Sequence, residues 1–279
     1  MTKIIAHRGA RSVAPENTIA AAEIARLIGA DLWECDVSIT KDGHLILFHD
    51  DNLLRTTDVV KKFPLHKSFQ VADFDLAQIK TLNTGTVFIK NDPFREIVAG
   101  NISDEYLESF KDEKIPTLED ALNYTKKTGW TINLELKSQI SNPPNFSIPK
   151  MVVELIIKLK VDPMLIIISS FNHRWLEDVK NLFPDIEVQH LFGDDIEDKK
   201  NNIDWQHLAF NLDFLDSYNF ETYNINSSII TIDEIKFLKM QGKKVNLFTV
   251  NDKNSMQHYI DAGVDGIFTD YPQIMVTLR

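Results

Sequence analysis

The fold is decided by residues 3–37, which read KIIAHRGARSVAPENTIAAAEIARLIGADLWECDV. The apolar run at 4–6 predicts a short strand, and apolar residues recur at helical spacing over 19–28. Gly29 suits the left-handed position that ends a helix, and residues 31–37 predict a second strand. A strand, a helix and a strand in succession indicate parallel strands joined by a crossover helix.

The alternation of strands and helices continues along most of the chain. Thr117 and Thr231 each begin a Thr-x-x-acid pattern, which is typical of a capping box, and Asn17 or Thr18 can cap the first helix. No Gly-x-Gly-x-x-Gly fingerprint follows a predicted strand, which weakens the alternative of an open, nucleotide-binding sheet. We therefore predict a single (β/α)8 TIM barrel over residues 1–279, because this fold takes roughly 250 residues. Further strands are expected at 45–48, 131–136, 165–169, 187–191, 207–212, 245–250 and 266–268.

Residues 51–115 interrupt this alternation with a mostly polar and charged stretch. A structureless segment of this length is unusual in a compact domain. We therefore interpret it as a small inserted subdomain after the second strand region, near the mouth of the site. Its scattered phenylalanines are expected to form the insertion's own core; they are Phe63, Phe69, Phe74 and Phe88.

Charge and composition restrict the partners. The chain has 41 acidic and 30 basic side chains, a net charge of −11, which disfavours nucleic acid and anionic membrane surfaces. Its one cysteine, Cys35, allows no intramolecular disulfide and is consistent with a reducing compartment. The first residues lack the apolar region of a signal peptide, and no apolar run approaches the ~20 residues of a membrane span. We expect a cytoplasmic protein without integral membrane association.

Two carboxylates lie two residues apart on the second predicted strand. Glu34 and Asp36 therefore point to the same face, while Cys35 faces the other way, toward the helices. Carboxylates buried on one face repel each other, and a divalent cation such as Mg²⁺ or Ca²⁺ removes that cost by binding their oxygens. The alternative is that both acids are solvated at a strand end.

Glu135 and Lys137 repeat this spacing on the strand at 131–136. The carboxyl ends of parallel barrel strands meet at one rim, so Glu135 can complete a three-carboxylate metal site there. Lys137 then lies beside the metal site, in position to contact a phosphate oxygen. The alternative is a simple ion pair between Glu135 and Lys137.

Two histidines follow apolar runs directly. His7 precedes Arg8 and Gly9 after the first strand, and His49 ends the run that begins at 45. A lone histidine at a strand end is more often structural, but a pair with pKa values near neutrality suits acid–base work. Phosphodiester cleavage needs one proton removed and one proton given. The other histidines, at 44, 66, 173, 190, 207 and 258, have no such context and are expected to be structural.

Taken in order, these elements resemble the glycerophosphodiester phosphodiesterase family along nearly the whole chain. Each motif alone is weak, but a dozen in the right order and spacing is a strong signal. The motifs are His7-Arg8-Gly9, Pro15-Glu16-Asn17-Thr18, Gly29-Ala30-Asp31, Glu34-Cys35-Asp36-Val37, Thr40-Lys41-Asp42-Gly43, His49-Asp50, Arg55-Thr56-Thr57, Ile115-Pro116-Thr117-Leu118, Glu135-Leu136-Lys137, Ser169-Ser170-Phe171, Thr249-Val250-Asn251 and residues 263–272.

The resemblance implies a TIM barrel with one divalent cation, Mg²⁺ or Ca²⁺. By position, Glu34, Asp36 and Glu135 match the family's metal ligands. His7 and His49 match its catalytic histidines.

The resemblance also implies roles around the phosphate. Arg8 and Lys137 match residues that hold it, and Glu16 lies in a motif near the site without an assigned role. Phe248 stands where the family usually has tryptophan, so the wall of the substrate pocket differs. The segment after Thr57 also lacks the usual glycine-containing continuation, which leaves the head-group specificity open.

The expected activity is metal-dependent hydrolysis of small glycerophosphodiesters to an alcohol and sn-glycerol 3-phosphate, with the two histidines as acid and base. One alternative is a phospholipase D-like enzyme acting on lysophospholipid or sphingomyelin. Others are a barrel that binds a phosphorylated ligand without turnover and a metal-dependent isomerase, in which His7 and Arg8 have no obvious task. The sequence leaves open the preferred metal, the acid and base assignment, the attacking oxygen, the oligomeric state and any lid function of the insertion.

Overall fold

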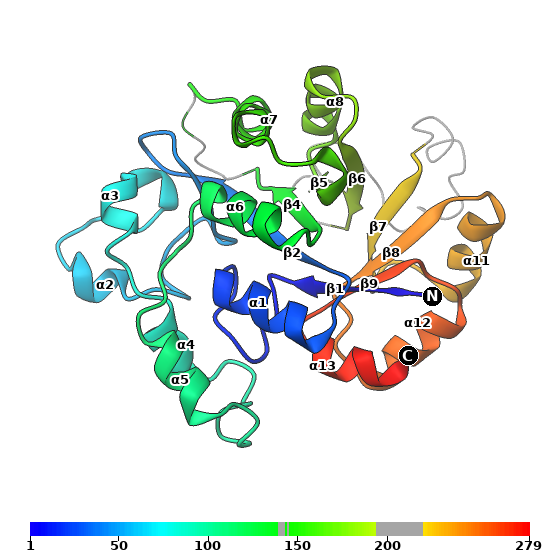
Figure 1. Ribbon diagram of the computed structural model, residues 1–279, viewed down its shortest axis with the longest axis horizontal. Helices are drawn as coiled ribbons and strands as arrows, with labels where there is room; N and C mark the ends of the chain where they lie inside the picture. The colour runs from blue at the N-terminus through cyan, green and yellow to red at the C-terminus, as the bar shows by residue number, and fades with distance from the viewer. Residues whose placement is uncertain (139–142, 144, 194–219) are drawn as a thin grey trace.

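Eight parallel strands close into a barrel in the computed structural model, which describes residues 1–138, 143, 145–193 and 220–279 (Figure 1). The ring is closed because β1 pairs in parallel with both β2 and β9. This confirms the predicted (β/α)8 barrel, whereas the strand expected at 207–212 lies outside the described residues. The strands are β1 (Lys3–His7), β2 (Leu32–Ile39), β4 (Ile132–Leu136), β5 (Ile166–Ser170), β6 (Glu187–Phe192), β7 (Thr222–Asn226), β8 (Lys244–Phe248) and β9 (Gly266–Thr269).

Alternation along each strand separates two layers of side chains. On β2, Trp33, Cys35 and Val37 are buried in the core between strands and helices. Cys35 therefore faces the helices, as predicted. Glu34 and Asp36 point the other way, into the barrel, because successive side chains of a strand point to opposite faces.

Strand β7 was not predicted from its sequence. Its inward-facing Asn224 donates to Gln189 Oε1 at 3.0 Å and accepts from Asn246 Nδ2 at 2.8 Å. A polar layer thus fills this part of the barrel, so β7 lacks the continuous apolar run that marks β5.

Helices alternate with the strands and surround the barrel (Figure 1). Both predicted capping boxes are present, at Thr117 and at Thr231, and Thr18 rather than Asn17 caps the first helix by accepting from the amide of Ala21. None of the helices in the described ranges has the length and apolar character needed to cross a membrane. The helices around the barrel are α1 (Ile19–Ile28), α6 (Leu118–Thr128), α7 (Ile148–Leu159), α8 (His173–Leu182), α11 (Ile232–Met240), α12 (Lys253–Asp261) and α13 (Pro272–Met275).

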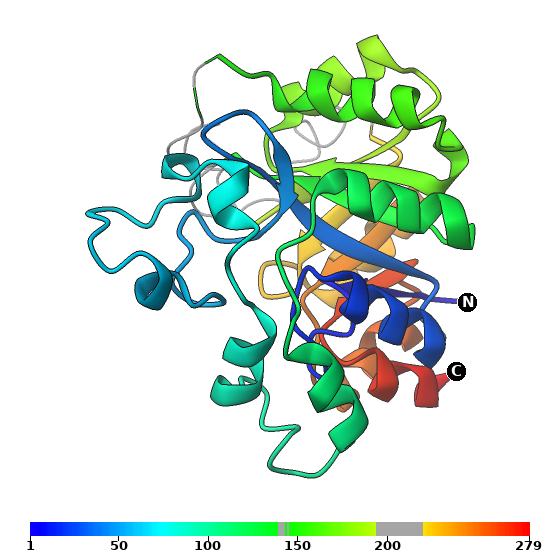
Figure 2. The same cartoon turned by 60° about the vertical axis from the view of Figure 1, so that its left-hand side comes forward.

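Strand β2 continues beyond the end of β1 and pairs there with an antiparallel strand, β3 (Leu45–Leu47). After β3, residues 51–115 leave the barrel and lie at the end opposite the chain termini, over the carboxyl ends of the strands (Figure 2). We call this stretch the insertion segment. It contains α2 (Val59–Lys62), α3 (Leu76–Ile79), α4 (Gly85–Asn91) and α5 (Asp104–Phe110).

The insertion segment has two small cores. Phe63, Phe69 and Phe74 belong to the first, but this core also contains Ile46 and Phe48, which precede the segment, so it is not the insertion's alone. Phe88 does not join them: it packs with Phe110 in a second core that includes Ala14 and Ala21 of the barrel. The second core therefore joins α4 and α5 to the loop after β1 and to α1.

Candidate active site

A cavity of about 210 Å³ opens at the carboxyl ends of the barrel strands. It contains most of the residues singled out from the sequence, although they come from positions 7 to 248. Asp36 lies fully buried beneath it, and Glu16 lines a neighbouring pocket instead. The predicted residues that line the cavity are His7, Arg8, Glu34, His49, Glu135, Lys137 and Phe248.

Three carboxylates converge in this cavity. Oxygens of Glu34, Asp36 and Glu135 all lie within 4.8 Å of one another. Glu34 Oε1 and Asp36 Oδ1 are buried, and within the described ranges neither accepts a hydrogen bond. Burial and the neighbouring charges of Asp36 and Glu135 raise the pKa of Glu34 well above its usual value. Buried, unsatisfied carboxylate oxygens in this arrangement fit a metal ion, which these three residues could hold.

Asn17 fixes the orientation of Asp36. Its Nδ2 donates to Asp36 Oδ2 at 2.8 Å, while the Asp36 amide donates to Asn17 Oδ1 at 3.0 Å. Burial acts to raise the pKa of Asp36, but the charges of Arg8, His49 and Lys137 outweigh it and hold the pKa below its usual range. Asp36 is therefore ionised. From the sequence, Asn17 was expected only as a possible helix cap, because its partner lies 19 residues away on β2.

Two cations accompany the carboxylates. Arg8 has a left-handed backbone with φ of 57°; its amide donates to Glu34 Oε2 at 3.0 Å, and its Nε lies 3.2 Å from Asp36 Oδ2. Gly9 continues the turn with φ of 81°, and a Cβ there would lie 2.6 Å from the backbone of Ala21, so only glycine fits. The loop after β1 thus holds Arg8 against the acids.

Lys137 follows β4 and faces the same acids. Its Nζ donates to Glu135 Oε1 at 2.9 Å and lies 3.9 Å from Asp36 Oδ1. Burial acts to lower the pKa of Lys137, but the two carboxylates raise it overall, so the lysine is charged. The ion pair with Glu135 is present, and Lys137 also lines the cavity.

Each predicted catalytic histidine is held by a carboxylate at Nδ1. His7 Nδ1 lies 2.7 Å from Asp270 Oδ1, and His49 Nδ1 lies 2.7 Å from Asp50 Oδ1. An ionised carboxylate is an acceptor only, so it assigns the proton to Nδ1 and leaves Nε2 for other partners. Burial and the nearby charge of Arg8 lower the pKa of His7. Asp270 had no assigned role from the sequence; it follows β9, the neighbour of β1 in the closed ring.

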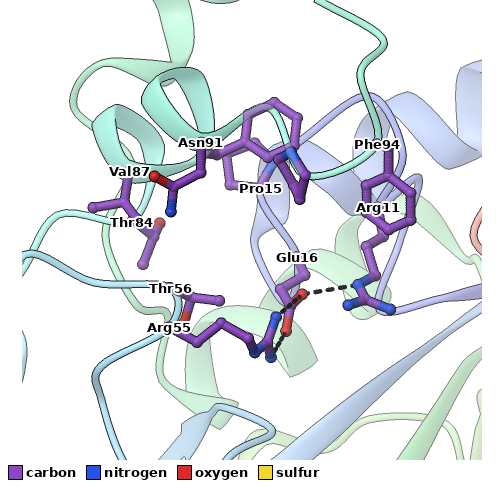
Figure 3. Close-up of a pocket in the computed structure, with 11 residues that line it drawn as sticks. Arg11, Pro15, Glu16, Arg55, Thr56, Thr84, Val87, Asn91 and Phe94 are labelled. Atoms are coloured by element: carbon purple, nitrogen blue, oxygen red, sulfur yellow. Dashed lines mark hydrogen bonds and ion pairs between the residues drawn. The ribbon is translucent and has the colours of Figure 1, made fainter.

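Glu16 connects three arginines, of which Figure 3 shows Arg11 and Arg55. It accepts from Arg8 Nη1 at 3.1 Å, from Arg11 Nε at 2.8 Å, and from Arg55 at 2.6 and 2.8 Å. Burial acts to raise the pKa of Glu16, but the arginines hold it well below its usual value. Arg55 also donates to Asp50 at 2.7 and 2.8 Å. A chain of ion pairs therefore connects Arg8 to the carboxylate that holds His49.

Phenylalanine rings form an apolar wall of the cavity. Phe248, at the end of β8, lies edge-on to Phe171 at 5.9 Å and to Phe268 at 6.3 Å. Five of the histidines expected to be structural do not line the cavity: His44, His66, His173, His190 and His258. The sixth, His207, lies outside the described residues.

Comparisons with known proteins identify the family of this chain. The sequence model of the glycerophosphoryl diester phosphodiesterase family matches residues 7–274. A glycerophosphodiester phosphodiesterase of Caldanaerobacter subterraneus subsp. tengcongensis is 34% identical over 277 residues, covering 99% of this chain and 97% of the relative. The enzyme of the same name from Bacillus altitudinis is 32% identical over 282 residues, covering 100% and 98%.

Solved structures agree with the barrel. An Oleispira antarctica phosphodiesterase, solved in complex with the product sn-glycerol-3-phosphate, has a TM-score of 0.75 at 26% identity and covers 100% of this chain and 96% of its own. A glycerophosphodiester phosphodiesterase from Agrobacterium tumefaciens shares the fold with a TM-score of 0.70 at 23% identity, covering 99% and 100%. Because the family model and the relatives match over nearly the full length, the chain belongs to the glycerophosphoryl diester phosphodiesterase family and is an enzyme with that activity.

Proposed function

We propose that the protein hydrolyses glycerophosphodiesters to an alcohol and sn-glycerol 3-phosphate, with His7 and His49 as its acid–base pair. One observation carries the proposal: two histidines, each held at Nδ1 by a carboxylate, line one cavity with two carboxylates and a lysine. The product named for the related Oleispira antarctica enzyme supports sn-glycerol 3-phosphate as the product here.

Glu34, Asp36 and Glu135 would hold one divalent cation, Mg²⁺ or Ca²⁺, since both prefer carboxylate oxygens. The chemistry supplied by such an ion is Lewis-acid polarisation of a phosphoryl oxygen. Asn17 keeps the Asp36 carboxylate in a fixed orientation for this task.

Arg8 and Lys137 would hold the phosphate. Both are charged, and both are fixed by carboxylates before any substrate arrives. Negative charge grows on the phosphoryl oxygens during attack, so fixed positive groups stabilise the transition state more than the ground state.

His7 and His49 would move the two protons of the reaction. One histidine takes the proton of the attacking oxygen through Nε2, and the other gives a proton to the alkoxide as its bond to phosphorus breaks. Asp270 and Asp50 keep the imidazoles in the required tautomer and stabilise the imidazolium that forms. The attacking oxygen is either the glycerol hydroxyl next to the phosphate, which gives a cyclic phosphate, or water.

The assay is release of glycerol 3-phosphate from glycerophosphocholine, glycerophosphoethanolamine and glycerophosphoglycerol with Mg²⁺, with Ca²⁺ and with excess EDTA. We expect release that depends on the metal. His7→Ala and His49→Ala should each lower kcat by ~10²-fold or more, since general acid–base catalysis contributes this much, with an unchanged circular dichroism spectrum. Near-normal turnover in either variant contradicts the assignment.

Glu34→Gln tests the metal ligands separately. It keeps the shape of the side chain but removes one negative charge from the buried cluster, so half-maximal activity should need a higher Mg²⁺ concentration. An unchanged Mg²⁺ titration argues against the ligand set.

Lysophospholipid is a second candidate substrate class. Leu54, Val60 and Leu65 of the insertion segment are exposed, and Leu54 directly precedes Arg55 of the site network. Exposed apolar side chains near the mouth are what access to lipid would need. Choline release from lysophosphatidylcholine micelles, assayed beside the glycerophosphodiesters, decides between the two classes.

A further inference from the structure

A second pocket, of about 330 Å³, lies beside the catalytic cavity and takes no part in the mechanism above (Figure 3). It lies between the loop after β1, which contributes Pro15, and the insertion segment, which contributes Val87, Phe88 and Phe94. Binding sites for small molecules typically measure ≈ 300–1,000 Å³. The catalytic cavity, at about 210 Å³, is the smaller of the two.

The second pocket adjoins the catalytic residues. Its floor contains Glu16 and Arg55, and these side chains hold Arg8 and the Asp50 carboxylate of His49. A narrow space of about 10 Å³ is lined by His49 together with Glu16, which also lines the second pocket. A group bound in the second pocket is therefore next to the side of the catalytic cavity that His49 and Arg8 form.

We propose that this second pocket receives the alcohol half of the diester and that it selects an uncharged, hydroxyl-bearing alcohol over a cationic one. The inference rests on the proposed glycerophosphodiester activity. It assigns the glycerol phosphate half to the catalytic cavity and the leaving alcohol to the second pocket, between α4 and the loop after β1.

The charges of the second pocket disfavour a cationic alcohol. Two arginines and one carboxylate line it, and that carboxylate, Glu16, already pairs with three guanidinium groups. The face of Phe94 is also taken, because Arg11 lies 5.1 Å from the ring centroid. A quaternary ammonium group is best held by a free carboxylate or an aromatic face. Glu16 is already paired, Arg11 covers one face of Phe94, and Phe88 is largely buried against Phe110.

An anionic alcohol is no better matched. Arg55 directs its Nε and both terminal nitrogens to Asp50 and Glu16, and Arg11 directs its Nε to Glu16 and its Nη1 to Asp270. Because all three nitrogens of Arg55 are held in this way, it must give up a carboxylate to bind another anion.

Neutral polar groups remain for a hydroxyl-bearing ligand. Figure 3 shows Asn91 and Thr84 directed toward the space above Arg55 and Thr56. Amide and hydroxyl groups both donate and accept, as alcohol hydroxyls require. Pro15, Val87 and Phe88 give an apolar wall for the carbon skeleton.

The test fills the second pocket without touching the catalytic cavity. Val87→Trp places a large ring in the pocket from α4, whereas Lys90→Trp introduces the same residue at an exposed position of α4 that does not line it. The substrates are glycerophosphoglycerol, glycerophosphocholine and the methyl diester of glycerol 3-phosphate, whose methyl group does not reach the pocket.

We expect wild-type kcat/KM for glycerophosphoglycerol to exceed that for glycerophosphocholine by about tenfold. Val87→Trp should raise KM for glycerophosphoglycerol by about tenfold or more but leave the methyl diester within about twofold, and Lys90→Trp should change neither. Asn91→Leu, at the exposed rim, should lower kcat/KM for glycerophosphoglycerol about threefold and spare the methyl diester, which keeps the test available if Val87→Trp does not fold.

The outcomes are distinguishable. If the wild-type enzyme cleaves none of the three diesters, the proposed function is wrong and the inference falls with it. If it cleaves them but Val87→Trp and Asn91→Leu match Lys90→Trp on glycerophosphoglycerol, only the pocket assignment is overturned. A preference for glycerophosphocholine overturns the selection of an uncharged alcohol.

Discussion

At the scale of single residues, His7 and Asp270 show how the site is assembled. They are separated by 263 positions in the sequence and by 2.7 Å between Nδ1 and Oδ1. Burial acts to raise the pKa of Asp270, but His7 and Arg11 lower it to about 2. Asp270 is therefore ionised at neutral pH, and in the proposed mechanism it acts through His7 as a positioning residue.

Asp270→Asn should lower kcat by ~10-fold or more, because an amide can present its NH₂ group to His7 and favour the wrong tautomer. The Mg²⁺ dependence should be unchanged, since Asp270 is not among the three converging acids. Steady-state kinetics with a metal titration check both statements, and Asp261→Asn, exposed on α12, is the matched control. Equal kcat values for the two variants would show that His7 does not need this carboxylate.

Residues at strand ends were predictable, whereas their supporting partners were not. Glu34 and Glu135 stand on strands with clear patterns, so the common rim of a barrel brings them together. Arg55 and Asp270 act through partners far away in the sequence, and only the closed ring and the fold of the insertion segment define those contacts. The motif containing Arg55 was a signal that could have indicated its importance, but not its bonds to Glu16.

At the scale of elements, the sequence predicted the strands with apolar runs and missed β7. Residues that point into a barrel are normally apolar, but here Asn224 and Asn246 bond to each other inside it. The strand of Asn224, β7, consequently shows no long apolar run, whereas β8, which carries Asn246, was predicted. Phe88 was misplaced for a related reason: nothing in the pattern of α4 says that it packs on Ala21 of the barrel.

The start of α6 offers a test at this scale. Thr117 accepts from the amide of Asp120, and Asp120 accepts from the amide of Thr117. Thr117→Ala removes the cap and should lower the free energy of unfolding by ~1 kcal/mol, whereas Thr117→Ser keeps the hydroxyl and most of the stability. Urea denaturation measures both, and equal losses in the two variants would mean that the hydroxyl contributes nothing.

At the scale of the whole molecule, buried histidines make stability depend on pH. Burial, followed by the nearby His173, lowers the pKa of His190 from 6.5 to about 3. Between these two pKa values, His190 binds a proton in the unfolded chain but not in the folded protein. The stabilisation is therefore complete above the unfolded pKa and decreases as the pH falls below 6.5.

His190→Phe removes the imidazole that binds this proton but keeps an aromatic ring against Phe220, on which His190 stacks. The difference in unfolding free energy between about pH 7.5 and about pH 5 should become smaller than in the wild type, by up to ~1.4 kcal/mol per pH unit. Urea denaturation at both pH values checks this, with His258→Gln, at an exposed position of α12, as control. An identical pH dependence in wild type and His190→Phe would show that His190 does not titrate as stated.

The pairing of β1 with β9 has a consequence for the newly made chain. His7 is synthesised with the first strand of the barrel, but its carboxylate partner follows the last strand of the barrel. In a chain still being synthesised, His7 therefore lacks the carboxylate that holds its Nδ1, however much of the rest of the barrel has already folded. In refolding experiments, recovered turnover should likewise report the meeting of the first and last strands, the contact with the largest sequence separation in the ring and so the one with the highest entropic cost.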